Sequence, residues 1–143
     1  MAYKLFIDTN VYLDFLMHRG AEWQDAENIL ELAEKNVIDV FTSASCLLNL
    51  MYIMRTNKLP NNEIIVHTNN ILSYSKLVNP DNGVFKTALS VGFTDPEYAV
   101  QYYTALQIKG IDYFITSNTR DYKKATSQLP VLTPKKFMTL YHK

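Results

Sequence analysis

The sequence predicts an α/β protein, a three-layer α/β/α sandwich in which helices cover both faces of a parallel sheet. Short apolar runs of strand type alternate along the chain with longer stretches whose apolar residues recur at helical spacing. A length of 143 residues, with 48% hydrophobic residues, suffices for a buried core and fits one domain over residues 1–143. No internal repeat or linker interrupts the alternation.

The first strand and the next two helices follow from apolar spacing. Lys4 to Ile7 is a short apolar run that ends at the carboxylate of Asp8. Two helices are then predicted from apolar residues at helical intervals, namely Leu13, Phe15 and Leu16 in one and Ala26, Ile29, Leu30 and Ala33 in the other.

The middle of the chain continues the same alternation. Residues 37–41 form a strand-like run, and the hydroxyl residues between 42 and 45 can cap the helix that follows through Met54. Another helix begins near Pro60, because proline is favoured in the first helical turn, and runs towards Tyr74.

The last elements are marked by prolines, glycine and caps. Residues 77–79 are a short strand, and a helix opens at Pro80 and Asp81 and runs through Leu89. Because Asp95 is an N-cap candidate followed by proline, a helix is predicted from 96 to about 109, closed by Gly110. Three elements complete the chain, a buried strand at 112–116, a short strand at 131–132 and a helix at 134–140.

Composition excludes several classes of site. The single cysteine, Cys46, cannot form an intramolecular disulfide, and it is expected to be a buried thiol in a reducing compartment. The three histidines, His18, His67 and His142, lack the spacing of a zinc site. No apolar run approaches the roughly 20 residues of a membrane span, so no membrane association and a cytoplasmic location are expected.

Polar residues follow two of the predicted strands directly. Asp8 ends the first strand, while Asn118 and Asp121 come just after the strand at 112–116. If these strands are neighbours where the strand order reverses, their carboxyl ends share one crevice. Oxygen ligands without histidine or cysteine suit a hard cation such as Mg²⁺ or Mn²⁺. Helix capping explains Asp8 equally well, and for Asn118 and Asp121, taken alone, turn formation is the better explanation.

Several short motifs, in this order and spacing, resemble a PIN domain. They are 8–11 (Asp-Thr-Asn-Val), 95–101 (Asp-Pro-Glu-Tyr-Ala-Val-Gln), 115–122 (Ile-Thr-Ser-Asn-Thr-Arg-Asp-Tyr) and 132–134 (Leu-Thr-Pro). Among PIN domains, the chain resembles the compact bacterial members grouped with VapC-type toxins. The resemblance implies a parallel sheet in the order 3-2-1-4-5 and a Mg²⁺- or Mn²⁺-dependent ribonuclease. It also implies an RNA substrate, a small antitoxin partner and a homodimer.

The resemblance carries over to the acidic site one position at a time. Asp8 matches the first acid, and Asn118 and Asp121 match the polar and acidic positions of the last loop. The second acid is normally a glutamate, and here Asn49 stands in its place. The third acid normally precedes the alanine at position 99, and here Tyr98 stands there. An amide brings no negative charge, and a phenol titrates near pH 10, so both departures weaken cation binding.

Two further acids lie beside the substituted position. Asp95 and Glu97 match additional acidic positions of related sequences, and either one can supply the missing charge. On a helix, however, Glu97 points about 100° away from Tyr98, and Asp95 also suits the role of N-cap. We therefore expect catalytic roles for Asp8, Asp95, Asn118 and Asp121, with Asp8, Asp121 and Asn118 as the metal ligands.

These residues support a PIN protein whose hydrolytic activity is weakened or lost. One alternative is a non-catalytic RNA-binding module, in which Arg120, Lys123 and Lys124 of the basic C-terminal part contact phosphate. The other is a protein-interaction module, for which the aromatic residues would supply anchors.

Overall fold

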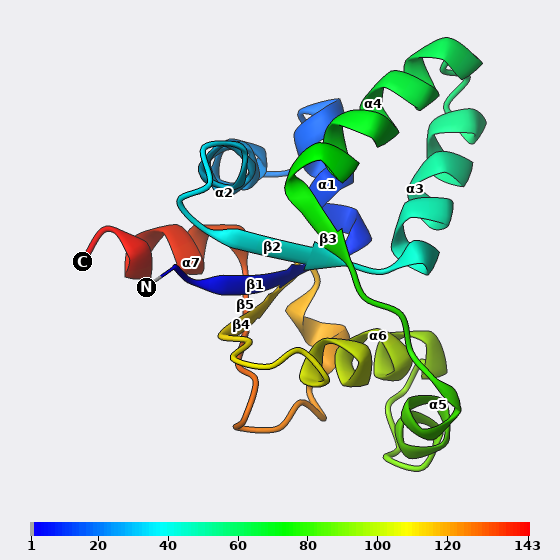
Figure 1. The fold of residues 1–143 in the computed structure, drawn as a ribbon, viewed down its shortest axis with the longest axis vertical. Coiled ribbons are helices and arrows are strands. Elements are labelled where there is room, and N and C mark those ends of the chain that lie inside the picture. Colours follow the sequence, from blue (N-terminus) through cyan, green and yellow to red (C-terminus); the bar gives the residue numbers. More distant parts are fainter. Residues whose placement is uncertain (1) are drawn as a thin grey trace.

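The computed structural model describes residues 2–143, which form a parallel sheet between two layers of helices (Figure 1). The strands are β1 (Lys4–Ile7), β2 (Asp39–Thr42), β3 (Ser75–Leu77), β4 (Tyr113–Ile115) and β5 (Val131–Leu132). All four pairings are parallel, and the strand order is β3-β2-β1-β4-β5. The predicted fold class and sheet order are therefore confirmed.

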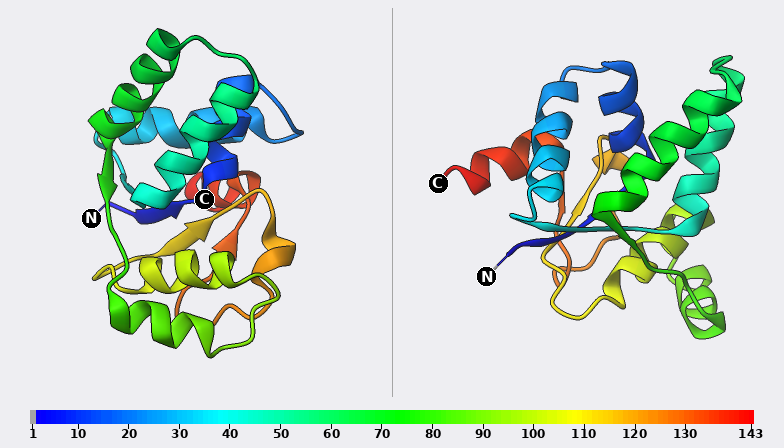
Figure 2. Two further views of the ribbon diagram at one scale, coloured as in Figure 1. Left: turned by 90° about the vertical axis from the view of Figure 1, so that its right-hand side faces the viewer. Right: turned by 45° about the horizontal axis from the view of Figure 1, so that its top comes forward.

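The helices are divided between the two faces of the sheet. On one face lie α1 (Thr9–Met17), α2 (Trp23–Glu34), α3 (Ala44–Thr56), α4 (Asn61–Tyr74) and α7 (Pro134–Tyr141). On the other face lie α5 (Asn82–Leu89), α6 (Pro96–Leu106) and the short 3-10 helix η1 (Thr119–Tyr122). Figure 2 shows α5 and α6 packed side by side on their face, away from the α3–α4 pair.

Alternating strand residues fill two separate cores. In β1, Leu5 and Ile7 belong to the core beneath α1, α2 and α7, whereas Phe6 belongs to the core beneath α6. Phe6 stacks on Phe114 of β4, with ring centroids 5.2 Å apart. Because successive side chains of a strand point to opposite faces, one short apolar strand serves both layers, as expected for a parallel sheet buried on both sides.

Polar caps set where the helices begin. Ser43 accepts a hydrogen bond from the backbone N–H of Cys46 at 3.1 Å and starts α3. Asp81 caps α5 through Val84 N–H, and Thr133 caps α7. Each such cap satisfies a backbone donor that the first helical turn leaves without a partner, which is worth about 1 kcal/mol.

Several predicted boundaries are displaced. The strand predicted at 77–79 is β3 at Ser75–Leu77, because α4 runs directly into this edge strand. The strand predicted at 37–41 begins at Asp39, since Val37 still belongs to the turn after α2 and donates to the Leu32 carbonyl at 2.9 Å. Helix α6 ends at Leu106, before the predicted limit near Lys109.

Two further expectations concern burial and membranes. Cys46 is a free thiol, and it is buried in the first turn of α3, as predicted. Within residues 2–143, no helix has both the length and the apolar character needed to cross a membrane.

Candidate functional site

The site lies where β1 and β4 end side by side. The parallel register pairs Ile7 with Ile115, and the backbone N–H of Asp8 donates to the Ile115 carbonyl at 3.0 Å. Asp8 and Thr116 are therefore neighbours at the carboxyl edge of the sheet. The chain builds β2 and β3 on one side of β1 and later β4 and β5 on the other, so this edge is the switch point at which ligands bind in such sheets.

Asp8 is buried and held by several donors. Its Oδ1 accepts the backbone N–H of Thr9 at 2.8 Å, which also starts α1. Its Oδ2 accepts the hydroxyls of Thr116 at 2.9 Å and Tyr122 at 3.0 Å, and the Asn10 amide lies at 3.5 Å. Since each carboxylate oxygen offers about two acceptor positions, the protein saturates Oδ2 and leaves part of Oδ1 for a ligand.

The carboxyl of Asp8 has an altered pKa. Burial raises it above the ordinary value, and the negative charge of Asp121 raises it further. The hydrogen bonds from Thr116, Tyr122 and Thr9 act in the opposite direction, because they stabilise the ionised form. Asp121 thus lies close enough to Asp8 for the two charges to interact.

The loop after β4 gathers the remaining predicted ligands. The backbone N–H of Asn118 donates to the Thr116 hydroxyl at 3.1 Å, which places Asn118 beside the Asp8 network. The Asn118 amide donates to Oδ2 of Asp121, and the Asp121 N–H donates back to the Asn118 carbonyl at 3.3 Å. The structure therefore brings Asp8, Asn118 and Asp121 to one corner, where Tyr122 closes η1 beneath them.

A cavity of about 220 Å³ opens in front of this corner. Asp8, directly after β1, and Asn49 of α3 line it, and Glu97 and Tyr98 line it from α6. Asn118 and Asp121 do not line it. Burial raises the pKa of the Tyr98 phenol, and the negative charges of Asp121, Asp8 and Asp95 add to the effect. Tyr98 is therefore neutral at physiological pH and contributes no anionic oxygen.

Asp95 has a structural role at the start of α6. Its carboxylate accepts the backbone N–H of Glu97 at 2.9 Å, which is the N-cap interaction that the sequence allows. Asp95 lines neither this cavity nor the one beside it, whereas Glu97 lines both. Of the two compensating acids, only Glu97 faces the space in front of Asp8.

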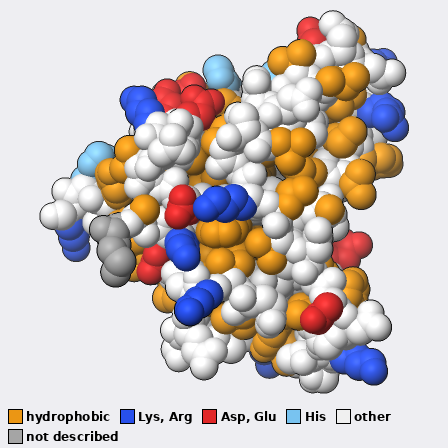
Figure 3. Space-filling model, in the orientation of Figure 1, with side chains coloured by type: hydrophobic (Ala, Val, Ile, Leu, Met, Phe, Trp, Pro, Cys, Tyr) orange, Lys and Arg blue, Asp and Glu red, His pale blue; other side chains and the backbone are white. Residues whose placement is uncertain are grey.

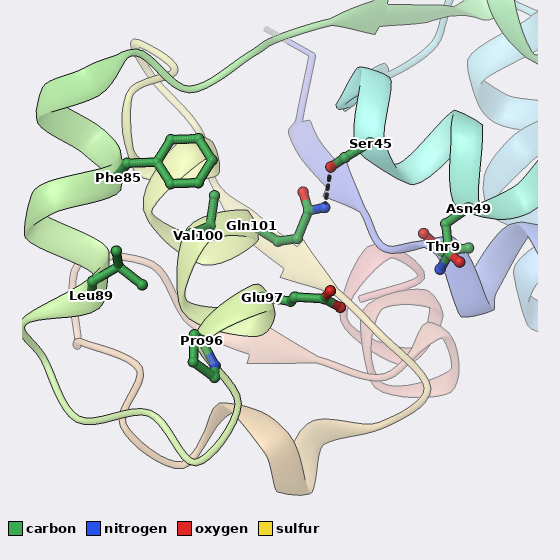
Figure 4. Close-up of a pocket in the computed structure, with 9 residues that line it drawn as sticks. All are labelled: Thr9, Ser45, Asn49, Phe85, Leu89, Pro96, Glu97, Val100 and Gln101. Carbon is green, nitrogen blue, oxygen red and sulfur yellow. Dashed lines mark hydrogen bonds between the residues drawn. The ribbon is translucent and has the colours of Figure 1, made fainter.

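The adjoining cavity is larger and has an apolar wall. It has a volume of about 440 Å³ and shares Thr9, Asn49, Glu97 and Gln101 with the first (Figure 4). Its far wall consists of apolar side chains from α5 and α6, namely Phe85, Leu89, Pro96 and Val100. The two cavities form one crevice, with carboxylates at one end and apolar side chains at the other.

Gln101 joins the two sides of this crevice. Its amide nitrogen donates to the Ser45 hydroxyl at 2.6 Å (Figure 4), and its amide oxygen accepts the Ser43 hydroxyl at 2.8 Å. Since Ser43 also caps α3, the network ties the start of α3 to the middle of α6. Gln101 follows Glu97 by one helical turn, and this spacing is the signal that could have placed it in the site.

Other residues of the site were not expected from the sequence. Tyr122 and Thr116 contact Asp8 from the β4 loop, and Arg19 lines the smaller cavity from the end of α1. Tyr122 directly follows the predicted ligand Asp121, which is a weak sequence signal for its place in the site. No sequence signal indicates that Arg19 lies there. The predicted RNA contacts Arg120, Lys123 and Lys124 are exposed near the same corner but line neither part of the crevice.

The donors present suit a hard divalent cation by type and provide little charge. Asp8, Asp121 and Asn118 offer oxygen atoms only, as Mg²⁺ and Mn²⁺ prefer. Over residues 2–143, no group of three or more histidine, cysteine or acidic side chains is placed to hold a metal ion. The corner therefore offers two carboxylates, Asp8 and Asp121, beside the amide of Asn118.

Comparisons with known proteins agree with this architecture. A family model described as the PIN domain matches residues 4–120. Among solved structures, the chain is similar to one in FitAB bound to an IR36 DNA fragment, with 15% identity, a TM-score of 0.63, and coverage of 91% of this chain and 94% of that one. No curated protein sequence matches it.

Two more solved structures show the same fold. A toxin-antitoxin complex from Klebsiella pneumoniae matches at 19% identity and a TM-score of 0.66, over 91% of this chain and 97% of that one. VapBC2 from Rickettsia felis, bound to a DNA fragment from its promoter, matches at 14% identity and a TM-score of 0.68, over 91% and 98%.

Proposed function

The chain belongs to the PIN domain family, and on that basis we propose that it is a toxin-type PIN protein that binds RNA in the crevice and hydrolyses it weakly. One observation carries the proposal. Asp8 is fixed at the switch point beside Asp121, while the facing positions hold the uncharged Asn49 and Tyr98. The site thus keeps the position of a hydrolytic centre and lacks much of its charge.

The residues act in distinct ways in this proposal. Asp8 and Asp121, with the Asn118 amide oxygen, would hold Mg²⁺ or Mn²⁺, and Thr116 would orient Asp8 for that purpose. When bound, the cation would stabilise the negative charge that develops on a phosphodiester. Glu97 is the remaining acid on the opposite wall of the cavity and would supply part of the missing charge.

Manganese titration tests the proposal. Calorimetry should detect weak binding to the wild-type protein and none to Asp8→Asn, whereas the exposed control Glu63→Gln should bind as the wild type does. RNA oligonucleotides incubated with Mn²⁺ should be cut slowly by the wild type and not at all by Asp8→Asn. RNA binding without metal binding or cleavage would instead establish the non-catalytic RNA-binding module.

A protein partner is proposed for the apolar end of the crevice. Phe85 and Leu89 of α5 are 46% and 60% exposed there, and together with Pro96 and Val100 they form an apolar wall open to a partner. One of the similar solved structures is a toxin-antitoxin complex, which supports a segment of a small antitoxin as the occupant. Phe85→Asp should abolish copurification with the product of an adjacent small gene, and Val37→Asp, in the exposed turn before β2, should not.

A homodimer is proposed through α3 and α4. Figure 3 shows hydrophobic side chains gathered over these helices. The exposed members are Leu48 and Tyr52 on α3 and Ile65, Val66 and Leu72 on α4. Light scattering should give twice the mass of one chain, and Leu48→Glu combined with Ile65→Glu should halve it.

A further inference from the structure

The end of α1 gives Arg19 a defined position. His18 adopts the left-handed conformation with φ of 49°, and the backbone N–H of Arg19 then donates to the Asp14 carbonyl at 3.1 Å. The His18 ring stacks on Trp23, the first residue of α2, with centroids 4.2 Å apart and an interplanar angle of 17°. Both contacts hold the chain in place around Arg19.

The side chain of Arg19 is also anchored. Its Nε donates to Oδ1 of Asp14 at 2.8 Å, and the Ser117 hydroxyl donates to Oδ2 of the same carboxylate at 2.5 Å. Asp14 is buried, so this carboxylate is a fixed support. Ser117 lies in the loop after β4, next to Asn118, which links the anchor to the site corner.

The anchoring contact uses only one nitrogen of the guanidinium. Neither terminal nitrogen of Arg19 has a hydrogen-bond acceptor within residues 2–143, and the side chain is 47% exposed. These two nitrogens form the flat fork that binds phosphate oxygens in a bidentate manner. The fork is thus oriented by the protein and free to bind a ligand.

Arg19 lies on the wall of the same cavity as Asp8, Glu97 and Asn49. Among the described residues that line this cavity it is the one cation, and the chain as a whole has no net charge to attract a polyanion. Asp8 and Glu97 repel an anionic ligand, and the positive charge of Arg19 offsets part of this repulsion.

We propose that Arg19 binds a backbone phosphate of the RNA in this cavity and that Asp14 is its positioning residue. The proposal rests on the proposed function, because it requires RNA in the crevice. If Arg19 served only to neutralise Asp14, its removal would lower stability and leave RNA affinity unchanged.

Fluorescence anisotropy of a labelled single-stranded RNA, measured in EDTA over a series of salt concentrations, tests this role. Arg19→Gln should weaken binding by about 5-fold at low salt and reduce the slope of log K against log salt by about 0.7, the value of one phosphate contact. Arg19→Lys should keep the slope and lose part of the affinity, since it retains the charge without the fork. Arg55→Gln removes an exposed arginine of α3 outside the crevice and should change neither quantity.

The outcomes separate the two proposals. A wild-type protein that does not bind RNA would overturn the proposed function together with this inference. Wild-type binding that Arg19→Gln leaves unchanged, in affinity and slope, would overturn the inference alone. Urea unfolding of each variant identifies any loss of binding that is due to loss of fold, and Asp14→Asn should weaken binding while keeping the wild-type slope.

Discussion

The hydroxyl of Tyr122 donates a hydrogen bond to Oδ2 of Asp8 at 3.0 Å, across 114 positions of sequence. The tyrosine is buried, and burial together with the charge of Asp8 raises the pKa of its phenol. Tyr122 therefore keeps its proton and remains a donor at all physiological pH values. A residue of the last loop thus supports the first carboxylate of the chain.

Tyr122→Phe should destabilise the protein by about 1–2 kcal/mol at pH 7, because it removes a donor from a buried carboxylate and keeps the aromatic packing. The melting temperature should fall by several degrees, at about 2–4 °C for each kcal/mol in a chain of this size. The loss should be smaller at pH 3, because the pKa of Asp8 is raised above its ordinary value of 3.8 and the carboxyl is therefore protonated there. Thermal melts at both pH values measure it, with the exposed Tyr52→Phe as the unaffected control.

Asp8→Asn should raise stability at neutral pH. Because the pKa of Asp8 is raised in the folded protein, the folded state binds the proton more tightly than the unfolded chain, whose carboxyl titrates near the ordinary value of 3.8. The free energy of unfolding of the wild type therefore falls as pH rises from about 3.8 to the raised pKa. Above the raised pKa, Asp8 is ionised in the folded protein and the destabilisation by its buried charge is complete. The advantage of the variant should be absent below this window and greatest above it.

Urea unfolding across pH 3–8 checks this sign. Asp121→Asn is the matched comparison, since Asp121 is half-buried and its charge is one cause of the raised pKa of Asp8. A variant Asp8→Asn that is less stable than the wild type at pH 7 would show that hydrogen bonds to the carboxylate outweigh its burial.

Tyr102→Phe should loosen the segment between η1 and β5. The Tyr102 hydroxyl donates to the Leu129 carbonyl at 2.6 Å and accepts the Thr126 N–H at 3.0 Å, and its ring is fully buried in the core. Loss of the hydroxyl leaves both backbone groups without this partner, at a cost of about 1–3 kcal/mol. Hydrogen exchange of the Thr126 amide should become faster, while exchange of the β1 amides should change only as far as global stability does.

Removal of the exposed charges Arg120, Lys123 and Lys124 should weaken RNA binding without affecting the fold. A triple change to glutamine should reduce the salt slope by about 0.7 for each RNA phosphate that is no longer neutralised, and so by up to about 2. Anisotropy with the same RNA measures the slope. Replacement of the exposed Lys135, Lys136 and Lys143, which line neither part of the crevice, controls for total charge. Equal losses of affinity in both triple variants would contradict a specific role.

The sheet and its helices were predictable because local signals agree with tertiary structure. Asp95 with Pro96 sets the start of α6, and apolar runs give β1 and β4. The strand β3 was displaced because it is a short edge strand with a buried Ser75 and exposed Lys76 and Leu77, so it lacks the apolar run of a central strand.

The candidate site was predictable only in part. Asp8, Asn118 and Asp121 follow strand ends, and strand order alone brings such positions together. Tyr122 and Arg19 reach the site by the direction of their side chains, which depends on η1 and on the left-handed residue that ends α1. These are tertiary properties that no spacing in the sequence encodes.

The stacking of His18 on Trp23 has a practical consequence. Trp23 is the only tryptophan of the chain, and its indole contacts the residue next to Arg19. Intrinsic fluorescence excited beyond the absorption of tyrosine therefore arises from one place, beside the His18 ring and close in sequence to Arg19 of the acidic cavity. A change in the conformation of the segment that carries His18 and Arg19 should therefore alter the emission of the unlabelled protein.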